Sequence, residues 1–226
     1  MWESHRAGRI FAAIIAGCAW LALTIQLTFN VEHGLARGVP VLSSLITYFS
    51  FFTIITNLVV AIILTVSLTA PDWSRFWSHA STKSALVVYI VIVGSVYALL
   101  LRHLWNPQGL QRFADILLHD VIPLSYPLYW LAFISKGVLR WIDPLLWLIY
   151  PVIYFIYSLL RGAFVGLYPY PFIDVATLGY ERILINALMF LVAFLGLGLL
   201  LVAIDHAAAA RQPKQTRLAA QPNSDK

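Results

Sequence analysis

Four polar side chains stand close together in a long apolar stretch of the sequence. The stretch YFSFFTIITNLVV, residues 48–60, carries Ser50, Thr53, Thr56 and Asn57. Spacings of three and four residues place Ser50, Thr53 and Asn57 on one face of a helix, whereas Thr56 lies off that face. A threonine hydroxyl is a nucleophile once a base takes its proton, and an amide N–H can stabilise an oxyanion. The same side chains are equally suited to hydrogen bonding between membrane helices.

A second polar group, in FADILLHDVIPLSYPLYW, contains a base that could activate such a hydroxyl. Asp115 and His119 are four residues apart, so they face the same side of a helix. The carboxylate of Asp115, or that of Asp120, can orient the imidazole of His119. Pro123 removes the hydrogen bond to the His119 carbonyl and predicts a kink that leaves room for a cavity. Ionisable groups are costly inside a membrane, so we interpret this cluster as functional.

A third set of polar residues follows one face of a later apolar segment. Tyr150, Tyr154, Tyr157 and Arg161 are spaced by four, three and four residues. The last three could bind the carboxylate head group of a substrate. Packed tyrosines with an arginine that reaches the membrane interface explain the pattern equally well. The YPYPF stretch that follows is expected either to cover a lipid pocket or to cap the helices.

Metal and cofactor motifs are not found in the sequence. His103 is expected at a helix end, and pairing with His119 in a metal or haem site is the weaker interpretation, because a third ligand is missing. Nucleotide-binding and metalloprotease motifs are also missing. We therefore expect no cofactor and no metal.

These residues must be positioned by membrane-spanning helices. Of 226 residues, 61% are hydrophobic and 11% are charged, and the mean hydropathy is +0.81. Six apolar segments are long enough to cross a bilayer. They are residues 9–29, 42–69, 84–101, 113–134, 144–166 and 183–205. They are continuously apolar rather than alternating, so we predict an all-α, polytopic bundle of six transmembrane helices and not a β-barrel.

The second segment is expected to be one continuous helix. On it Ser43, Thr47, Ser50, Thr53 and Asn57 would form a single polar stripe. We divide the chain into a six-helix transmembrane domain, residues 1–205, and a disordered cytoplasmic tail, residues 206–226, which is rich in Pro, Gln and Ala. The lone Cys18 is interpreted as a packing residue.

The distribution of lysine and arginine predicts the orientation. With the N-terminus inside, the inner segments hold ten basic residues: Arg6, Arg9, Arg75, Lys83, Lys136, Arg140, Arg211, Lys214, Arg217 and Lys226. The outer segments hold five: Arg37, Arg102, Arg112, Arg161 and Arg182. Both termini are therefore expected in the cytoplasm, and the basic residues reflect topology rather than binding of nucleic acid.

Three segments resemble the bacterial membrane proteins of the Pr-six-Pr family, over about residues 8–205. They are YFSFFTIITNLVV, LLRHLWNPQGLQRFADILLHDVIP and YPVIYFIYSLLRGAFVGLYPYPFIDVATLGYERILINAL. The family is distantly similar to the eukaryotic androgen-induced and ADTRP-like proteins, which hydrolyse fatty acid esters of hydroxy fatty acids. The resemblance implies a multi-pass protein of the bacterial inner membrane. It also implies a threonine nucleophile in FFT, at Thr53, and a histidine shortly before a proline, at His119. Resemblance alone leaves Thr56 open as the nucleophile, and the helical face favours Thr53.

Two hypotheses follow from the sequence. In the first, the chain takes part in lipid metabolism as an intramembrane threonine hydrolase of lipid esters: Thr53 attacks, His119 is the base, Asp115 or Asp120 orients it, and Asn57 stabilises the oxyanion. Its partners would be membrane lipids and a lipid ester substrate. In the second, it is a non-catalytic lipid- or small-molecule-binding protein, or a small transporter. Thr53 and His119 on one shared cavity would favour the first hypothesis.

Overall fold

The computed structural model describes residues 2–69 and 79–211, and in this part of the chain helices are joined by short connections and no strand is present. Six of the described helical segments are long and apolar enough to cross a membrane: Arg6–Ala36, Phe52–Thr69, Ala80–Leu101, Gly109–Phe133, Asp143–Val165 and Val175–Ala210. The predicted all-α bundle is confirmed, and the chain is a multi-pass membrane protein.

The described elements have these bounds. They are α1 (Trp2–Ala36), α2 (Val41–Tyr48), α3 (Phe52–Thr69), α5 (Ala80–Val96), the π-helical turn η1 (Tyr97–Leu101), α6 (Gly109–Ile116), the π-helical turn η2 (Leu117–Val121), α7 (Ile122–Phe133), α8 (Asp143–Trp147), α9 (Ile149–Val165), the 3₁₀ turn η3 (Pro171–Ile173) and α10 (Val175–Ala210).

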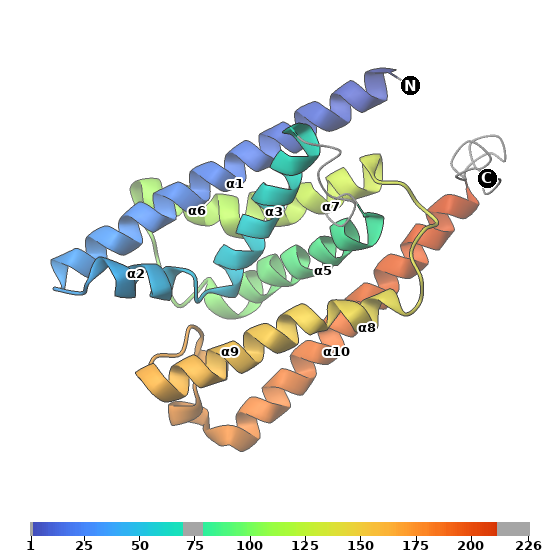
Figure 1. The fold of residues 1–226 in the computed structure, drawn as a ribbon. Coiled ribbons are helices and arrows are strands. Elements are labelled where there is room, and N and C mark those ends of the chain that lie inside the picture. Colours follow the sequence, from blue (N-terminus) through green and yellow to red (C-terminus); the bar gives the residue numbers. More distant parts are fainter. Residues whose placement is uncertain (1, 70–78, 212–226) are drawn as a thin grey trace.

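Helix α3 lies at the centre, where α1 and α5 pack against it, and α7 packs on both α1 and α5 (Figure 1). Small residues let α1 and α3 approach closely, since Ala19, Ala22, Val60 and Ala61 are fully buried. Helices α8, α9 and α10 form a second group that contacts the first mainly through α5. The start of α1 and the end of α10 lie at one end of the bundle, and α2 and the α9–α10 connection lie at the other (Figure 1).

The prediction of one continuous helix over residues 42–69 is wrong. The chain leaves the helical path at residues 49–51, so α2 ends at Tyr48 and α3 starts at Phe52. The turn tightens there, because the Ser50 N–H donates to the Thr47 carbonyl at 3.1 Å and the Ser50 hydroxyl donates to the Ile46 carbonyl at 2.6 Å. The predicted single stripe is therefore broken, and Thr53 stands in the first turn of α3.

Two π-helical turns interrupt the third and fourth spans. The turn η1 contains Tyr97 and η2 contains His119. Pro123, at the start of α7, cannot donate to a preceding carbonyl, which accounts for the irregular turn before it. Gly94 allows the close approach of the two helices, because a Cβ there would lie 2.8 Å from the Pro123 Cβ. A π turn thus precedes Pro123, and the kink predicted there stays a prediction.

The described basic residues assigned to the inner side lie at one end of the bundle. Arg9 donates to the Leu68 carbonyl, Tyr126 donates to that of Lys83, and the loop containing Lys136 contacts the end of α10 through Asp205. The other residues assigned to that side, Arg75, Lys214, Arg217 and Lys226, lie outside the described residues. So do residues 212–226 of the predicted tail, whereas its first residues, 206–210, are alanine-rich and belong to α10, which ends at Ala210.

Candidate functional site

Thr53 and His119 line one cavity at the end of the bundle that carries α2. We call this cavity, of about 640 Å³, the polar chamber. Its wall is built by α1, α2, the first turn of α3, η1, α6, η2 and the α9–α10 connection. Asp115 and Tyr97 line it as well. The structure thus brings the predicted hydroxyl, from the second span, to the same cavity as the predicted imidazole and carboxylate, both from the fourth span.

Asp115 holds the imidazole of His119 in a fixed orientation. The Nδ1 atom of His119 lies 3.0 Å from Asp115 Oδ1 and 3.1 Å from the Asp115 carbonyl oxygen. Nδ1 therefore carries the proton, and Nε2 is the nitrogen with a free lone pair. Within the described residues Nε2 has no hydrogen-bond partner, so it is available to a group in the chamber.

Two aromatic side chains fix this Asp–His pair. The ring of Tyr97 stacks on that of His119, with centroids 3.8 Å apart and planes 13° apart. The Tyr97 hydroxyl donates to Asp115 Oδ2, and Trp105 Nε1 donates to Oδ1 at 3.3 Å. Asp115 thus receives three side-chain donors, although it is only 6% exposed. The arrangement compensates a buried carboxylate and leaves the imidazole few alternative rotamers.

Thr53 differs from other threonines in the spans. Thr24, Thr28, Thr65 and Thr69 each donate to the carbonyl four residues earlier. Thr53 instead starts a helix, and its hydroxyl has one partner in the described chain, the Tyr170 hydroxyl at 3.5 Å.

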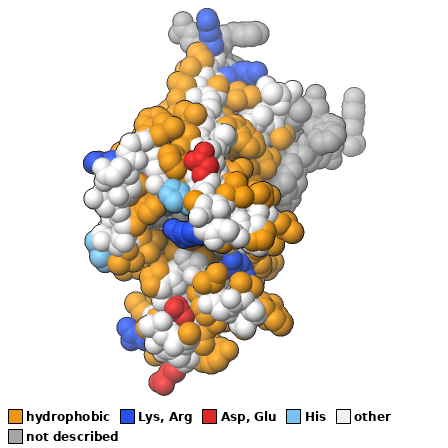
Figure 2. All heavy atoms as spheres, turned by 90° about the vertical axis from the view of Figure 1, so that its left-hand side faces the viewer, with side chains coloured by type: hydrophobic (Ala, Val, Ile, Leu, Met, Phe, Trp, Pro, Cys, Tyr) orange, Lys and Arg blue, Asp and Glu red, His pale blue; other side chains and the backbone are white. Residues whose placement is uncertain are grey.

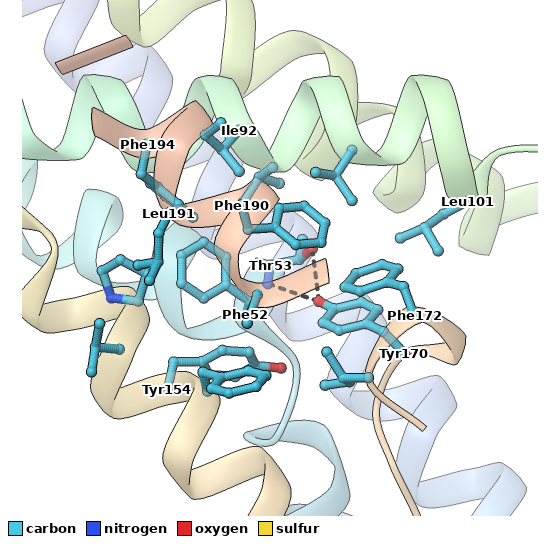
Figure 3. A pocket seen from close by; sticks show the side chains of 17 residues that line it. Phe52, Thr53, Ile92, Leu101, Tyr154, Tyr170, Phe172, Phe190, Leu191 and Phe194 are labelled. Carbon is cyan, nitrogen blue, oxygen red and sulfur yellow. Dashed lines mark hydrogen bonds between the residues drawn. The ribbon is translucent and has the colours of Figure 1, made fainter. Parts of the chain in front are cut away.

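The backbone N–H of Thr53 belongs to the first turn of α3 and donates to the Tyr170 hydroxyl oxygen at 3.3 Å (Figure 3). First-turn N–H groups have no partner inside their own helix, so they are available to an oxygen outside it. Burial raises the pKa of Tyr170 above its ordinary value. Its hydroxyl therefore stays protonated and can act as a donor.

Asn57 ties the two halves of the site together. Its side-chain nitrogen donates to the Thr53 carbonyl at 2.9 Å and to the Leu118 carbonyl at 3.3 Å. Leu118 directly precedes His119, so this one amide fixes the first turn of α3 against η2. Both amide protons are used in these contacts. The geometry makes Asn57 a positioning residue and leaves it without a proton for the oxyanion role expected from the sequence.

The other polar residues of the SFFTIITN stretch, residues 50–57, contact groups outside the Asp–His pair. The Thr56 hydroxyl lies 3.0 Å from that of Tyr150, and Thr56 lines neither described pocket around Thr53. The Ser50 hydroxyl donates to Ile46 and lies 2.9 Å from the Tyr157 hydroxyl. Thr53 is therefore better placed than Thr56 for attack on a molecule in the chamber.

The predicted substrate-binding residues of α9 contact protein groups. The Tyr154 hydroxyl donates to the Ser50 carbonyl at 2.9 Å, and Tyr157 contacts the Ser50 side chain. Arg161 donates to Thr47 Oγ1 at 3.2 Å and to the Leu167 carbonyl at 2.8 Å. These contacts hold α9 against the turn between α2 and α3, and they match the packing interpretation of the pattern.

Asp120 contacts Arg102 and not His119 among the described residues. Its carboxylate forms an ion pair with Arg102. Of the two carboxylates considered from the sequence, Asp115 is the one that contacts the imidazole.

The chamber reaches the end face of the bundle, where His33, Arg37 and Gln111 contribute to its lining. Figure 2 views this end and shows basic, acidic and histidine side chains close together in the middle of the face, surrounded by hydrophobic side chains. A polar opening in an apolar surface would let an amphiphilic molecule place its polar part in the chamber.

Sequence reasoning missed Tyr97, Trp105 and Tyr170 as parts of the site. Tyr97 stands in an apolar run without a local signal. Trp105 resembled an ordinary interfacial tryptophan, and Tyr170 lay in the YPYPF stretch, which was expected to cover a pocket without a residue being named.

No protein-family model matches the chain, and neither the curated proteins nor the solved structures compared with it give a match.

Proposed function

We propose that the chain is an intramembrane hydrolase of lipid esters, with Thr53 as nucleophile and His119 as general base. One observation carries the proposal: an unbonded imidazole nitrogen and a threonine hydroxyl free of backbone bonding line the same chamber. The resemblance of the sequence to the Pr-six-Pr family, and through it to hydrolases of fatty acid esters of hydroxy fatty acids, points to the same substrate class.

The first half of the reaction transfers the acyl group to the protein. His119 Nε2 takes the proton of Thr53 Oγ1 as this oxygen attacks the ester carbonyl carbon. The tetrahedral intermediate collapses, the carbon–oxygen bond to the alcohol breaks, and the departing oxygen receives the proton from Nε2. Asp115 accepts the Nδ1–H bond throughout and stabilises the transient imidazolium.

The second half regenerates the hydroxyl. A water molecule gives a proton to His119 Nε2 and attacks the acyl-threonine carbonyl carbon. Collapse breaks the bond to Thr53 Oγ1, which recovers the proton and releases a carboxylic acid. The Tyr170 hydroxyl is the donor assigned to the developing oxyanion, joined by the Thr53 N–H once the oxyanion replaces Tyr170 as its acceptor, since the Asn57 amide is bonded to two carbonyls.

We place the protein in the bacterial inner membrane with both termini in the cytoplasm. The excess of basic residues on the side of the termini supports this orientation. The polar chamber then opens at the outer face, where lipids of the outer leaflet can reach it.

The test uses the full chain, purified in detergent, with a fluorogenic fatty-acyl ester and a fluorophosphonate probe. Thr53→Ala and His119→Ala are expected to reduce turnover and labelling to background. Thr56→Val is the matched control, because it removes a neighbouring buried hydroxyl outside the chamber, and it is expected to keep wild-type turnover. Wild-type labelling and turnover in Thr53→Ala and His119→Ala would contradict the proposal and favour a non-catalytic lipid-binding protein.

A further inference from the structure

A second pocket meets the polar chamber at Thr53. It has a volume of about 110 Å³ and lies between α3, α5, α9, α10 and the α9–α10 connection (Figure 3). We call it the apolar pocket. Phe52, Ile92, Phe190 and Phe194 are among its lining residues.

The two cavities share only a few lining residues. Thr53, Leu101 and Tyr170 line both of them. In Figure 3 the Tyr170 ring lies beside Phe172, and its hydroxyl points toward Thr53. The two rings stack with centroids 5.0 Å apart. Thr53 therefore stands at the junction, where a carbonyl carbon could meet its hydroxyl while the substrate extends into both cavities.

The wall of the apolar pocket fits hydrocarbon. Its side chains carry hydroxyls only at Thr53, Tyr154 and Tyr170, and that of Tyr154 is bonded to the Ser50 carbonyl. A polar group deep in this pocket would lose its hydrogen bonds to water without replacement. A methylene chain has no such cost.

The position of His119 decides which part of an ester enters which cavity. The departing alcohol oxygen must receive its proton from His119 Nε2, and His119 lines the chamber and not the apolar pocket. The alcohol part must therefore lie in the chamber. The acyl part extends from the carbonyl carbon on the other side of Thr53.

We infer that the apolar pocket is the acyl-chain site of the proposed hydrolase and sets its acyl selectivity. This inference rests on the proposed function. A bilayer is as apolar as the pocket, so moving a chain from one to the other gains little hydrophobic free energy. Shape and length therefore decide which chains react, and the alcohol part is recognised separately in the chamber.

Ala187→Phe tests the inference by filling the pocket from α10. Ala193→Phe is the matched control, since Ala193 is exposed on the same helix and does not line the pocket. Relative turnover is measured with umbelliferyl acetate, octanoate and palmitate. Ala187→Phe is expected to lower turnover of the palmitate relative to the acetate by roughly 10-fold. Ala193→Phe is expected to leave the ratio at the wild-type value, and an unchanged ratio in Ala187→Phe overturns the inference.

A second variant works in the opposite direction. Ile92→Ala enlarges the pocket and is expected to raise turnover of a methyl-branched acyl ester relative to its linear isomer. A series with one acyl group and alcohols of increasing length checks the orientation. If Ala187→Phe changes selectivity for the alcohol and not for the acyl chain, the assigned orientation is wrong.

Photolabelling separates this inference from the proposed function. The purified chain is irradiated with a diazirine analogue of palmitic acid, and labelled peptides are mapped by mass spectrometry. Labels are expected on α5 and α10 near Ile92 and Phe190, and they should be lost in Ala187→Phe but not in Ala193→Phe. Such labelling without ester hydrolysis means that the chain site stands and the proposed function fails. Hydrolysis without pocket labelling overturns the inference alone, and labelling with unchanged selectivity identifies a resident lipid site and also overturns it.

Discussion

Two buried carboxylates at opposite ends of the bundle are compensated in different ways. Asp205, on α10, is fully buried and accepts backbone N–H bonds from Gly137 and Leu139 at 2.9 and 3.1 Å. Asp115, next to the chamber, accepts from the side chains of Tyr97, Trp105 and His119. One carboxylate fixes a loop to a helix, whereas the other fixes an imidazole.

The two sets of hydrogen bonds have different roles. The bonds of Asp205 stabilise the fold, whereas those of Asp115 orient an imidazole that could take part in a reaction. Backbone donors cannot change protonation state, and the Asp205 contacts face no described cavity. The imidazole beside Asp115 lines the chamber and has a second nitrogen without a partner in the described chain, so its orientation matters to any molecule there. A substitution of Asp115 should therefore lower turnover, whereas a substitution of Asp205 should lower stability.

The largest effect is expected from Asp115→Asn. The amide can donate to His119 Nδ1, which moves the imidazole proton to Nε2 and removes the base. We expect kcat to fall by roughly 10²–10⁴-fold, with little change in KM, because substrate contacts remain. Ester turnover measures this, and thermal unfolding in detergent checks that the variant is folded. A folded variant with wild-type kcat would show that Asp115 does not orient a catalytic imidazole.

Asp205→Ala should show the opposite pattern. It leaves the N–H groups of Gly137 and Leu139 without their acceptor, and we expect unfolding free energy to fall by about 1.5–3 kcal/mol. Turnover per folded molecule should stay at the wild-type level. Chemical denaturation and active-site titration with the fluorophosphonate probe measure the two quantities separately. A fall in kcat that matches that of Asp115→Asn would remove the distinction between the two clusters.

The sequence predicts the spans well because the solvent for these helices is lipid. Six apolar segments of sufficient length leave few alternatives to a helical bundle. The contact between Asp115 and His119 could be predicted equally well, since both lie on one helical segment at a spacing that brings them to the same face.

The break at residues 49–51 could not be predicted from the sequence in the same way. It contains no glycine or proline, and an aromatic, apolar run is compatible with an uninterrupted helix. Besides the local bonds of Ser50, a tertiary contact acts at the break, because Tyr154 donates to the Ser50 carbonyl from α9. Tyr97 and Tyr170 were missed for a related reason, since each meets the site from an element distant in sequence. The role of Asn57 could not be predicted either, because one of the two carbonyls that its amide contacts, that of Leu118, belongs to a neighbouring span.

The smallest expected effect concerns Lys136, in the loop that Asp205 fixes. Its Nζ donates to the Trp130 and Ile134 carbonyls at 2.6 and 2.5 Å and lies 4.0 Å from the Trp130 ring centroid. Burial lowers the pKa of Lys136 from 10.5 to about 8, although the Asp205 carboxylate opposes the shift. Between these values the unfolded chain binds the proton more tightly than the folded one, so Lys136 makes stability rise as pH increases from about 8 to 10.5.

Lys136→Met isolates this contribution. The difference in unfolding free energy between wild type and Lys136→Met, measured by chemical denaturation across this pH range, should increase in favour of wild type. Turnover of the two proteins should remain equal at each pH, because the loop lies at the end of the bundle away from the chamber. A difference in stability that does not vary with pH would mean that Lys136 keeps an ordinary pKa. A pH-dependent difference in turnover would show that the loop of Lys136 affects the site near Asp115. The contacts of Asp205 and those of Asp115 would then not have separate roles.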